Sequence, residues 1–245
     1  MGVVLPKAQP REMRFLTAEE VRRVADGIRE PYDTLLHVLA CGGLRWGEAA
    51  ALRRGRCELL RSRLHVVESL SEVRGAFHFG ATKTYQARAV VLPRLLRDRF
   101  AEHLAHEVGA DSDDLVFTAP RGGPLRRKEF SVGFWRPALE EAGIDHARVH
   151  DLRHTCASLL IATGANPKAV QAQLGDSSIQ VTFDRYGHLF PSDQMALAAK
   201  MDDVFLESQT DTRRTSDDTK WSSCPLSTHC LSEIMSERAC QHRLL

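Results

Sequence analysis

Residues 150–188 read HDLRHTCASLLIATGANPKAVQAQLGDSSIQVTFDRYGH and decide how the rest of this 245-residue chain is interpreted. His150 and Arg153 are three residues apart at a helix start that Asp151 marks, so both side chains reach the same side of one helical turn. An imidazole and a guanidinium side by side can both donate hydrogen bonds to a bound anion. The stretch therefore predicts an anion site at the beginning of a helix.

Two further helices are predicted downstream of this pair. Asn166 and Pro167 are typical of a helix start, and Gly175 is typical of its end. Ser178, together with the serine before it, caps a third helix that ends at Tyr186. The sequence thus places a tyrosine at the end of a short helix.

Apolar residues of this third helix follow a helical period. Ile179, Phe183 and Tyr186 occupy positions i, i+4 and i+7. Side chains at this spacing share one face, so we expect the three of them on the buried face, with the tyrosine hydroxyl reaching a cleft.

Two more cationic side chains lie upstream. Residues 42–48 read GGLRWGE, in which the paired glycines break a helix and place Arg45 at the start of the next one. Lys83, between two threonines, lies in a turn between two β-like runs. A turn projects from the body of a domain, where a lysine can reach a DNA strand and donate a proton.

In this order, the cationic residues, the His-x-x-Arg pair and the tyrosine resemble the catalytic domain of the tyrosine recombinases, the phage-integrase family. The likeness covers roughly residues 12–206. It implies an α+β, mostly helical catalytic domain with a small three-stranded antiparallel sheet. It also implies a separate helical DNA-clamping domain upstream, which makes residues 1–11 a linker remnant, and residues 207–245 are expected to be a disordered polar tail.

Local patterns agree with a mostly helical domain. Residues 17–20, TAEE, form a capping box that opens a helix, and Pro31 precedes a second apolar helix. Between residues 59 and 91 the pattern changes to β-like runs at 64–67, 75–79 and 88–92. Helices are expected again after Pro93, from about 127 to 142, and from Pro191 through Met195, Leu197, Met201 and Phe205.

The resemblance implies site-specific DNA strand exchange by an integrase of a mobile element or prophage. Tyr186 would attack the phosphorus and hold the 3′ phosphate, and this bond conserves energy, so neither ATP nor a metal cofactor is needed. Arg45 and Arg153 would bind the non-bridging oxygens with paired donors. His150 is the candidate base and Lys83 the candidate acid for the departing 5′ oxygen. The expected partners are double-stranded DNA and three further copies of the chain, as a tetramer on paired sites.

One position departs from the family pattern. The family pattern has Leu-Gly followed by histidine or, in some members, by tryptophan. This chain reads Leu174-Gly175-Asp176 instead. An ionised aspartate has no proton to donate and repels an anion. We therefore expect Asp176 to lower cleavage, unless it serves as the N-cap of the next helix.

Composition narrows the class of protein. Hydrophobic residues make up 43% and charged residues 27%, as in soluble globular proteins, and no apolar run could span a membrane, so we expect a cytoplasmic protein. The net charge of +1 does not indicate a nucleic-acid binder, but residues 45–63 hold six arginines against two glutamates. The six cysteines form no C-x-x-C pair, and the cysteines and histidines of the tail match no common metal site.

Three alternatives remain open at this stage. His146, His150 and His154 recur every four residues, as in some metal hydrolases, although no HExxH glutamate is present. Residues 166–186 have helix-turn-helix spacing, which suits a DNA-binding module without enzymatic activity. The third alternative is a truncated, inactive DNA-binding remnant of a mobile element.

Overall fold

The computed structural model describes residues 13–82, 87–190, 195, 198–203 and 205–206. Contacts divide the chain into two units, Met1–Pro191 and Ser192–Leu245. The helices of the first unit are α1 (Ala18–Gly27), α2 (Tyr32–Gly42), α3 (Trp46–Ala50), α4 (Arg94–His106), α5 (Arg127–Phe130), α6 (Arg136–Glu141), α7 (Asp151–Ala162), α8 (Pro167–Leu174) and α9 (Ile179–Tyr186). Short 3-10 turns are η1 (Arg54–Arg56), η2 (Leu59–Arg61) and η4 (Gly187–Leu189), and η3 (Ser131–Trp135) is a π-helical turn.

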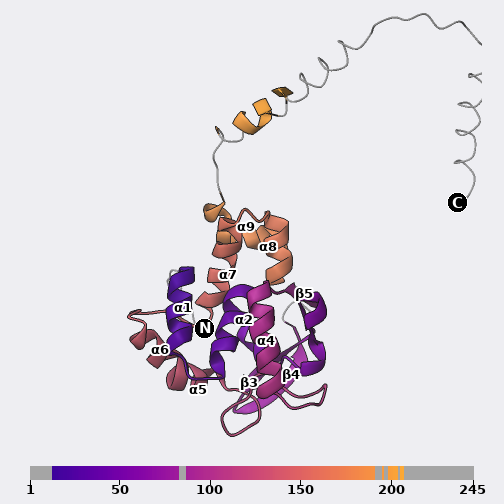
Figure 1. Ribbon diagram of the computed structural model, residues 1–245, viewed down its shortest axis with the longest axis vertical. Coiled ribbons are helices and arrows are strands. Elements are labelled where there is room, and N and C mark those ends of the chain that lie inside the picture. Colours follow the sequence, from indigo (N-terminus) through magenta and orange to yellow (C-terminus); the bar gives the residue numbers. More distant parts are fainter. Residues whose placement is uncertain (1–12, 83–86, 191–194, 196–197, 204, 207–245) are drawn as a thin grey trace, which may run out of the picture. The chain divides into compact units, whose positions relative to one another are not determined.

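Helix α2 runs through the middle of the first unit, where it packs against α1, α4 and α7 (Figure 1). Its buried leucines and valine belong to one hydrophobic core that also takes in side chains of α1, α4 and α6. The predicted capping box at Thr17 and Glu20 is present at the start of α1. Gly43 ends α2 in the left-handed conformation, at φ +66°, which turns the chain toward Arg45.

The strands form two small antiparallel sheets. The three-stranded sheet has the order β1 (Cys57–Glu58), β2 (Arg63–Val66) and β5 (Arg88–Val91), and β3 (Glu68–Val73) pairs with β4 (Ala76–Ala81) as a separate hairpin. Two of the predicted β-like runs, 64–67 and 88–92, thus meet in one sheet. The run at 75–79 does not join them, because it pairs with the chain just before it through a tight turn at Gly75.

The starts and ends of α8 and α9 lie at the residues that the sequence predicted. Asn166 caps α8 by accepting a hydrogen bond from the Ala169 N–H, and Gly175 ends it at φ +67°. Ser178 caps α9 in the same way. Helix α7 packs on α2 and on α8, so the helix that carries Arg153 lies directly against the hydrophobic core (Figure 1).

In the second unit, Met195, 198–203 and 205–206 are helical, where the sequence predicted a last helix. Leu197 and the predicted start at Pro191 lie outside the described residues, as do the segments 1–11 and 207–245 that were expected to be a linker and a tail. Within the described part of the chain, no helix is both long and apolar enough to cross a bilayer.

Candidate active site

A pocket of about 720 Å³ brings four of the predicted site residues together. Arg45, His150, Arg153 and Asp176 all line it. Arg45 and His150 occupy the N-cap positions of α3 and α7, and Asp176 follows the glycine that ends α8. Three helix ends from distant parts of the chain therefore converge on one cavity.

Arg153 is a buried anchor of this site, with a relative exposure of 2%. One terminal nitrogen, Nη1, donates to the Gly43 carbonyl at 2.5 Å and to the Leu174 carbonyl at 2.7 Å. The other, Nη2, donates to Oδ1 of Asp176 at 2.8 Å. The guanidinium of Arg153 thus joins the ends of α2 and α8.

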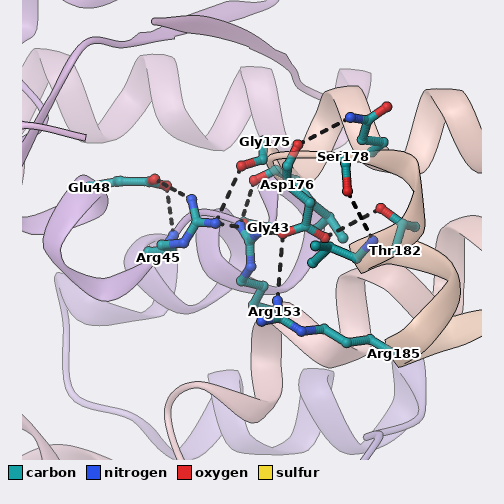
Figure 2. A network of polar contacts seen from close by, with 12 residues as sticks. Gly43, Arg45, Glu48, Arg153, Gly175, Asp176, Ser178, Thr182 and Arg185 are labelled. Atoms are coloured by element: carbon teal, nitrogen blue, oxygen red, sulfur yellow. Dashed lines mark hydrogen bonds and ion pairs between the residues drawn. The ribbon is translucent and has the colours of Figure 1, made fainter. Parts of the chain in front are cut away.

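The Asp176 carboxylate lies among three arginines (Figure 2). Besides the bond to Arg153, its Oδ1 is 3.6 Å from Nη2 of Arg45 and 3.7 Å from Nη1 of Arg185. Its side chain is 1% exposed, and its Oδ2 accepts a bond from the Thr182 hydroxyl at 3.5 Å. The Asp176 carboxylate therefore lies between the two arginines that were predicted to be catalytic.

The alternative that Asp176 is the N-cap of α9 is wrong. Ser178 takes that position, because its hydroxyl accepts the Val181 N–H at 3.3 Å. Because Ser178 already accepts the hydrogen bond from this backbone N–H, the Asp176 carboxylate is not needed as a cap and can pair with guanidinium groups.

Arg45 is held in place by Glu48, a residue for which the sequence predicted no role. Glu48 accepts from Nη1 of Arg45 at 2.9 Å and from both terminal nitrogens of Arg88, at 3.0 and 2.7 Å. Arg45 also donates to the carbonyl of Gly175, the end of α8, at 3.3 Å. A side chain at Gly175 would collide with Arg88, whose Cδ lies 2.6 Å from the position of such a Cβ. Arg45, which lines the pocket, is therefore held in place by a network that joins it to Glu48 and Arg88.

We expect Glu48→Gln to destabilise the fold by about 3 kcal/mol, because it removes a buried carboxylate that neutralises the largely covered guanidiniums of Arg45 and Arg88. Burial alone would raise the pKa of Glu48, but Arg88 and Arg45 hold it below its ordinary value of 4.5. Its stabilisation is therefore present above about pH 4.5 and is lost as the pH falls through the lowered value. Urea denaturation at pH 7 measures the effect.

The matched control is Glu19→Gln, which removes an exposed carboxylate that pairs with Arg22 at the same i,i+3 spacing. Little change is expected there, since exposed ion pairs contribute little. Equal losses for Glu19→Gln and Glu48→Gln would contradict the structural role of the buried network.

Tyr186 is fully buried and does not line the pocket. Its hydroxyl lies 2.9 Å from Nδ1 of His154. Burial raises the pKa of Tyr186 to about 12, against the influence of Arg153. The prediction for the buried face of α9 is confirmed for Tyr186 but wrong for Ile179 and Phe183, which are 40% and 42% exposed. The second buried residue of this helix is Thr182, one turn before Tyr186.

His150 is exposed at the edge of the pocket, and its ring packs edge-on against that of His154 with 4.8 Å between centroids. Desolvation against the pocket wall, together with the charges of His154 and Arg153, lowers the pKa of His150 to about 4. Its imidazole is therefore neutral at pH 7 and able to accept a proton.

Lys83, the predicted acid, lies outside the described residues. The predicted basic run at 45–63 is partly used inside the fold. Arg53 pairs with Glu68 at 2.6 Å and Arg54 donates to the Leu104 carbonyl at 2.6 Å, whereas Arg56 and Arg63 are exposed. The exposed members of the run remain available to an anionic partner.

Sequence reasoning missed the roles of His154 and Arg88. His154 could have been noticed as the residue that directly follows the arginine of the His-x-x-Arg pair. Arg88 gives no such signal, because it is one residue of a β-like run and meets Glu48 only through the fold.

The structure weighs against two of the alternatives. Among the described residues, no group of three or more His, Cys, Asp or Glu side chains is arranged to hold a metal ion, the three spaced histidines included. In the helix-turn-helix reading, Gln180 and Arg185 would read bases. Gln180 instead donates to Asp184 at 2.8 Å, and Arg185 is turned toward Asp176.

Comparison with known proteins identifies relatives of this chain. The transposase A of transposon Tn554 from Staphylococcus aureus is 27% identical over 198 residues, which is 78% of this chain and 53% of the relative. The ICEBs1 integrase of Bacillus subtilis (strain 168) is 30% identical over 207 residues, 79% of this chain and 55% of the relative. The chain thus spans about half the length of the curated relatives it matches.

Solved structures show the same fold. The Tn1549 transposon integrase in complex with a circular intermediate DNA aligns with a TM-score of 0.67 and 20% identity over 80% of this chain and 67% of that one. The catalytic domain of bacteriophage HP1 integrase aligns with a TM-score of 0.54 and 21% identity over 77% of this chain and 95% of that one. The family model described as the phage integrase family matches residues 14–193. The chain, with its converging arginines and its helix-terminal tyrosine, therefore belongs to the phage integrase family.

Proposed function

We propose that this chain cuts and rejoins double-stranded DNA at specific sites through a 3′-phosphotyrosyl intermediate. The observation that carries the proposal is the convergence of Arg45, His150 and Arg153 on one pocket, from segments far apart in the sequence. Two guanidiniums facing one cavity match the charge that develops on the non-bridging oxygens of a phosphodiester under attack. Membership of the phage integrase family supports the same reaction.

In this proposal each residue has a distinct role. Arg45 and Arg153 bind the non-bridging oxygens, Tyr186 is the nucleophile, Lys83 protonates the departing 5′ oxygen, and His150 is the neutral base or donor at the edge of the pocket. Asp176 competes with the phosphate for the arginines. The catalytic domain comprises residues 12–206, works in the cytoplasm, and assembles as a tetramer on paired DNA sites.

The test needs no knowledge of the target site. The full chain is incubated, in EDTA, with a pool of nicked duplexes of randomised sequence, and the mixture is denatured in SDS. We expect DNA that stays linked to protein, with the phosphate mapped by mass spectrometry to the peptide containing Tyr186. The linked DNA, once sequenced, identifies the site.

A second candidate function is a DNA-binding remnant without activity. The observation that favours it is the ion pair between Asp176 and Arg153, which fills the anion-binding position with a side chain of the protein. The same assay separates the two functions. DNA that is retained before SDS but never linked afterwards would support the remnant and end the enzymatic proposal.

A further inference from the structure

The nucleophile proposed above has a partner that the family motif does not point to. The Tyr186 hydroxyl contacts Nδ1 of His154 at 2.9 Å, whereas the imidazole proposed as base, His150, lies at the edge of the pocket. His154 is 6% exposed and Tyr186 is fully buried, so this hydrogen bond is shielded from water. A contact of this kind is the geometry that proton transfer requires.

On the basis of this contact, and resting on the proposed function, we propose that His154, in place of His150, is the catalytic residue that accepts the phenolic proton when Tyr186 attacks DNA. As the bond from the tyrosine oxygen to phosphorus forms, the bond from phosphorus to the 5′ oxygen breaks. The phenolic proton passes to Nδ1 of His154, and the departing oxygen takes a proton from the acid proposed at Lys83. In religation the 5′ hydroxyl attacks phosphorus and gives its proton to the amine proposed at Lys83. The bond from phosphorus to the tyrosine oxygen breaks, and His154 returns its proton to that oxygen.

The imidazole is in the correct state for this role. Burial lowers the pKa of His154, so the ring is neutral at pH 7 and has one nitrogen free to accept. The charged groups that act on it are Asp151, which favours its protonation, and Arg148, Arg153 and Arg185, which oppose it. The T-shaped contact with Phe15 and the edge-on contact with the His150 ring fix its plane.

The position of His154 on α7 couples it to the phosphate site. It directly follows Arg153, whose guanidinium lines the pocket, and the charges of Arg153, Asp176 and Arg185 all act on the Tyr186 hydroxyl. The residue that would hold the phosphate and the residue that contacts the nucleophile are therefore adjacent on α7. Since the pKa of Tyr186 is raised to about 12, the phenol is protonated at rest and needs a base.

The decisive variant is His154→Asn. The asparagine Oδ1 can take the place of Nδ1 and accept the same hydrogen bond, but an amide does not take up a proton at neutral pH. We expect linked DNA to form on the order of 10²–10⁴ times more slowly, with the fold retained. The wild-type rate should rise with pH through the lowered pKa of His154 and then level off. The rate of the variant should keep rising toward the pKa of the phenol.

A sulfur in place of the bridging 5′ oxygen makes a leaving group that needs no proton. His154→Asn should stay slower by the same factor on this DNA, because its defect lies at the nucleophile. Restoration of the wild-type rate would instead place His154 at the leaving group and overturn the assignment. His146→Asn, at an exposed histidine of the same segment, should behave like the wild type.

A measurement without DNA tests the proton positions directly. In ¹⁵N NMR spectra of the full chain at pH 7, His154 should carry its proton on Nε2, and Tyr186→Phe should shift the Nδ1 signal. A proton on Nδ1, or a wild-type rate and pH profile for His154→Asn, would overturn the inference. These results are distinct from failure of the proposed function, in which the wild-type chain itself links no DNA.

Discussion

Replacing Tyr186 with phenylalanine is expected to abolish protein-linked DNA and to leave DNA binding intact. The substitution removes the oxygen that forms the bond to phosphorus, so no slower route through the same residue remains. The ring stays in its buried cluster with Leu174 and Val170, and only the hydrogen bond to His154 is lost. That loss should lower the free energy of unfolding by only about 1–3 kcal/mol. Denaturing gels with the randomised nicked pool measure the linkage, and urea denaturation measures the stability.

Tyr32→Phe is the matched control for this experiment. Tyr32 is also buried, and its hydroxyl donates to the Thr118 carbonyl at 2.9 Å. The variant should therefore lower the free energy of unfolding by a similar amount without changing the pocket. It should form linked DNA at the wild-type rate. If Tyr186→Phe still formed linked DNA, the nucleophile would be a different residue, and the assignment of His154 would fall with that of Tyr186.

The helices around the site could be predicted from the sequence because their ends are local. The capping box at Thr17, the asparagine cap at Asn166 and the serine cap at Ser178 each satisfy backbone N–H groups within three residues. Gly175 ends its helix because it adopts a positive φ. Signals of this kind need no knowledge of the rest of the fold.

The features that the sequence did not predict depend on contacts between distant segments. Glu48 and Arg88 are 40 residues apart, and Asp176 lies 23 residues from Arg153. No local pattern shows that a carboxylate will meet a guanidinium there. The wrong prediction for Ile179 and Phe183 has the same cause. An apolar period shows which residues of α9 share a face, but it does not show which face packs against α8.

These long-range contacts give the site two opposed properties. The Arg45–Glu48–Arg88 network and the three acceptors of Arg153 hold the guanidiniums in place before any ligand arrives. Such preorganisation is what transition-state stabilisation requires. One of the acceptors of Arg153 is nevertheless the Asp176 carboxylate, which has the charge of the expected ligand. The same contact that orders the site would therefore compete with the proposed phosphate ligand.

Asp176→His is expected to raise the rate of linkage by on the order of 10²–10³-fold. At an effective dielectric constant near 20, two like unit charges about 4 Å apart repel by about 4 kcal/mol, which corresponds to nearly a thousandfold. Histidine removes this repulsion from the phosphate position and can donate a hydrogen bond in its place. Asp176→Asn removes the charge, keeps the size of the side chain and supplies a neutral amide donor, so it should give an intermediate gain that comes mainly from the lost repulsion.

Stability must be followed in both variants, because Arg153 keeps two carbonyl acceptors but loses its counter-charge, at a cost of about 3 kcal/mol. Asp33→Asn is the control, since Asp33 pairs with Arg99 away from the pocket and its loss should not change the rate. Linkage that is no faster in folded Asp176→His and Asp176→Asn than in the parent would show that the carboxylate does not hold the arginines back from DNA. A gain confined to Asp176→His would mean that removal of the charge is not sufficient and that the imidazole itself is what this chain lacks.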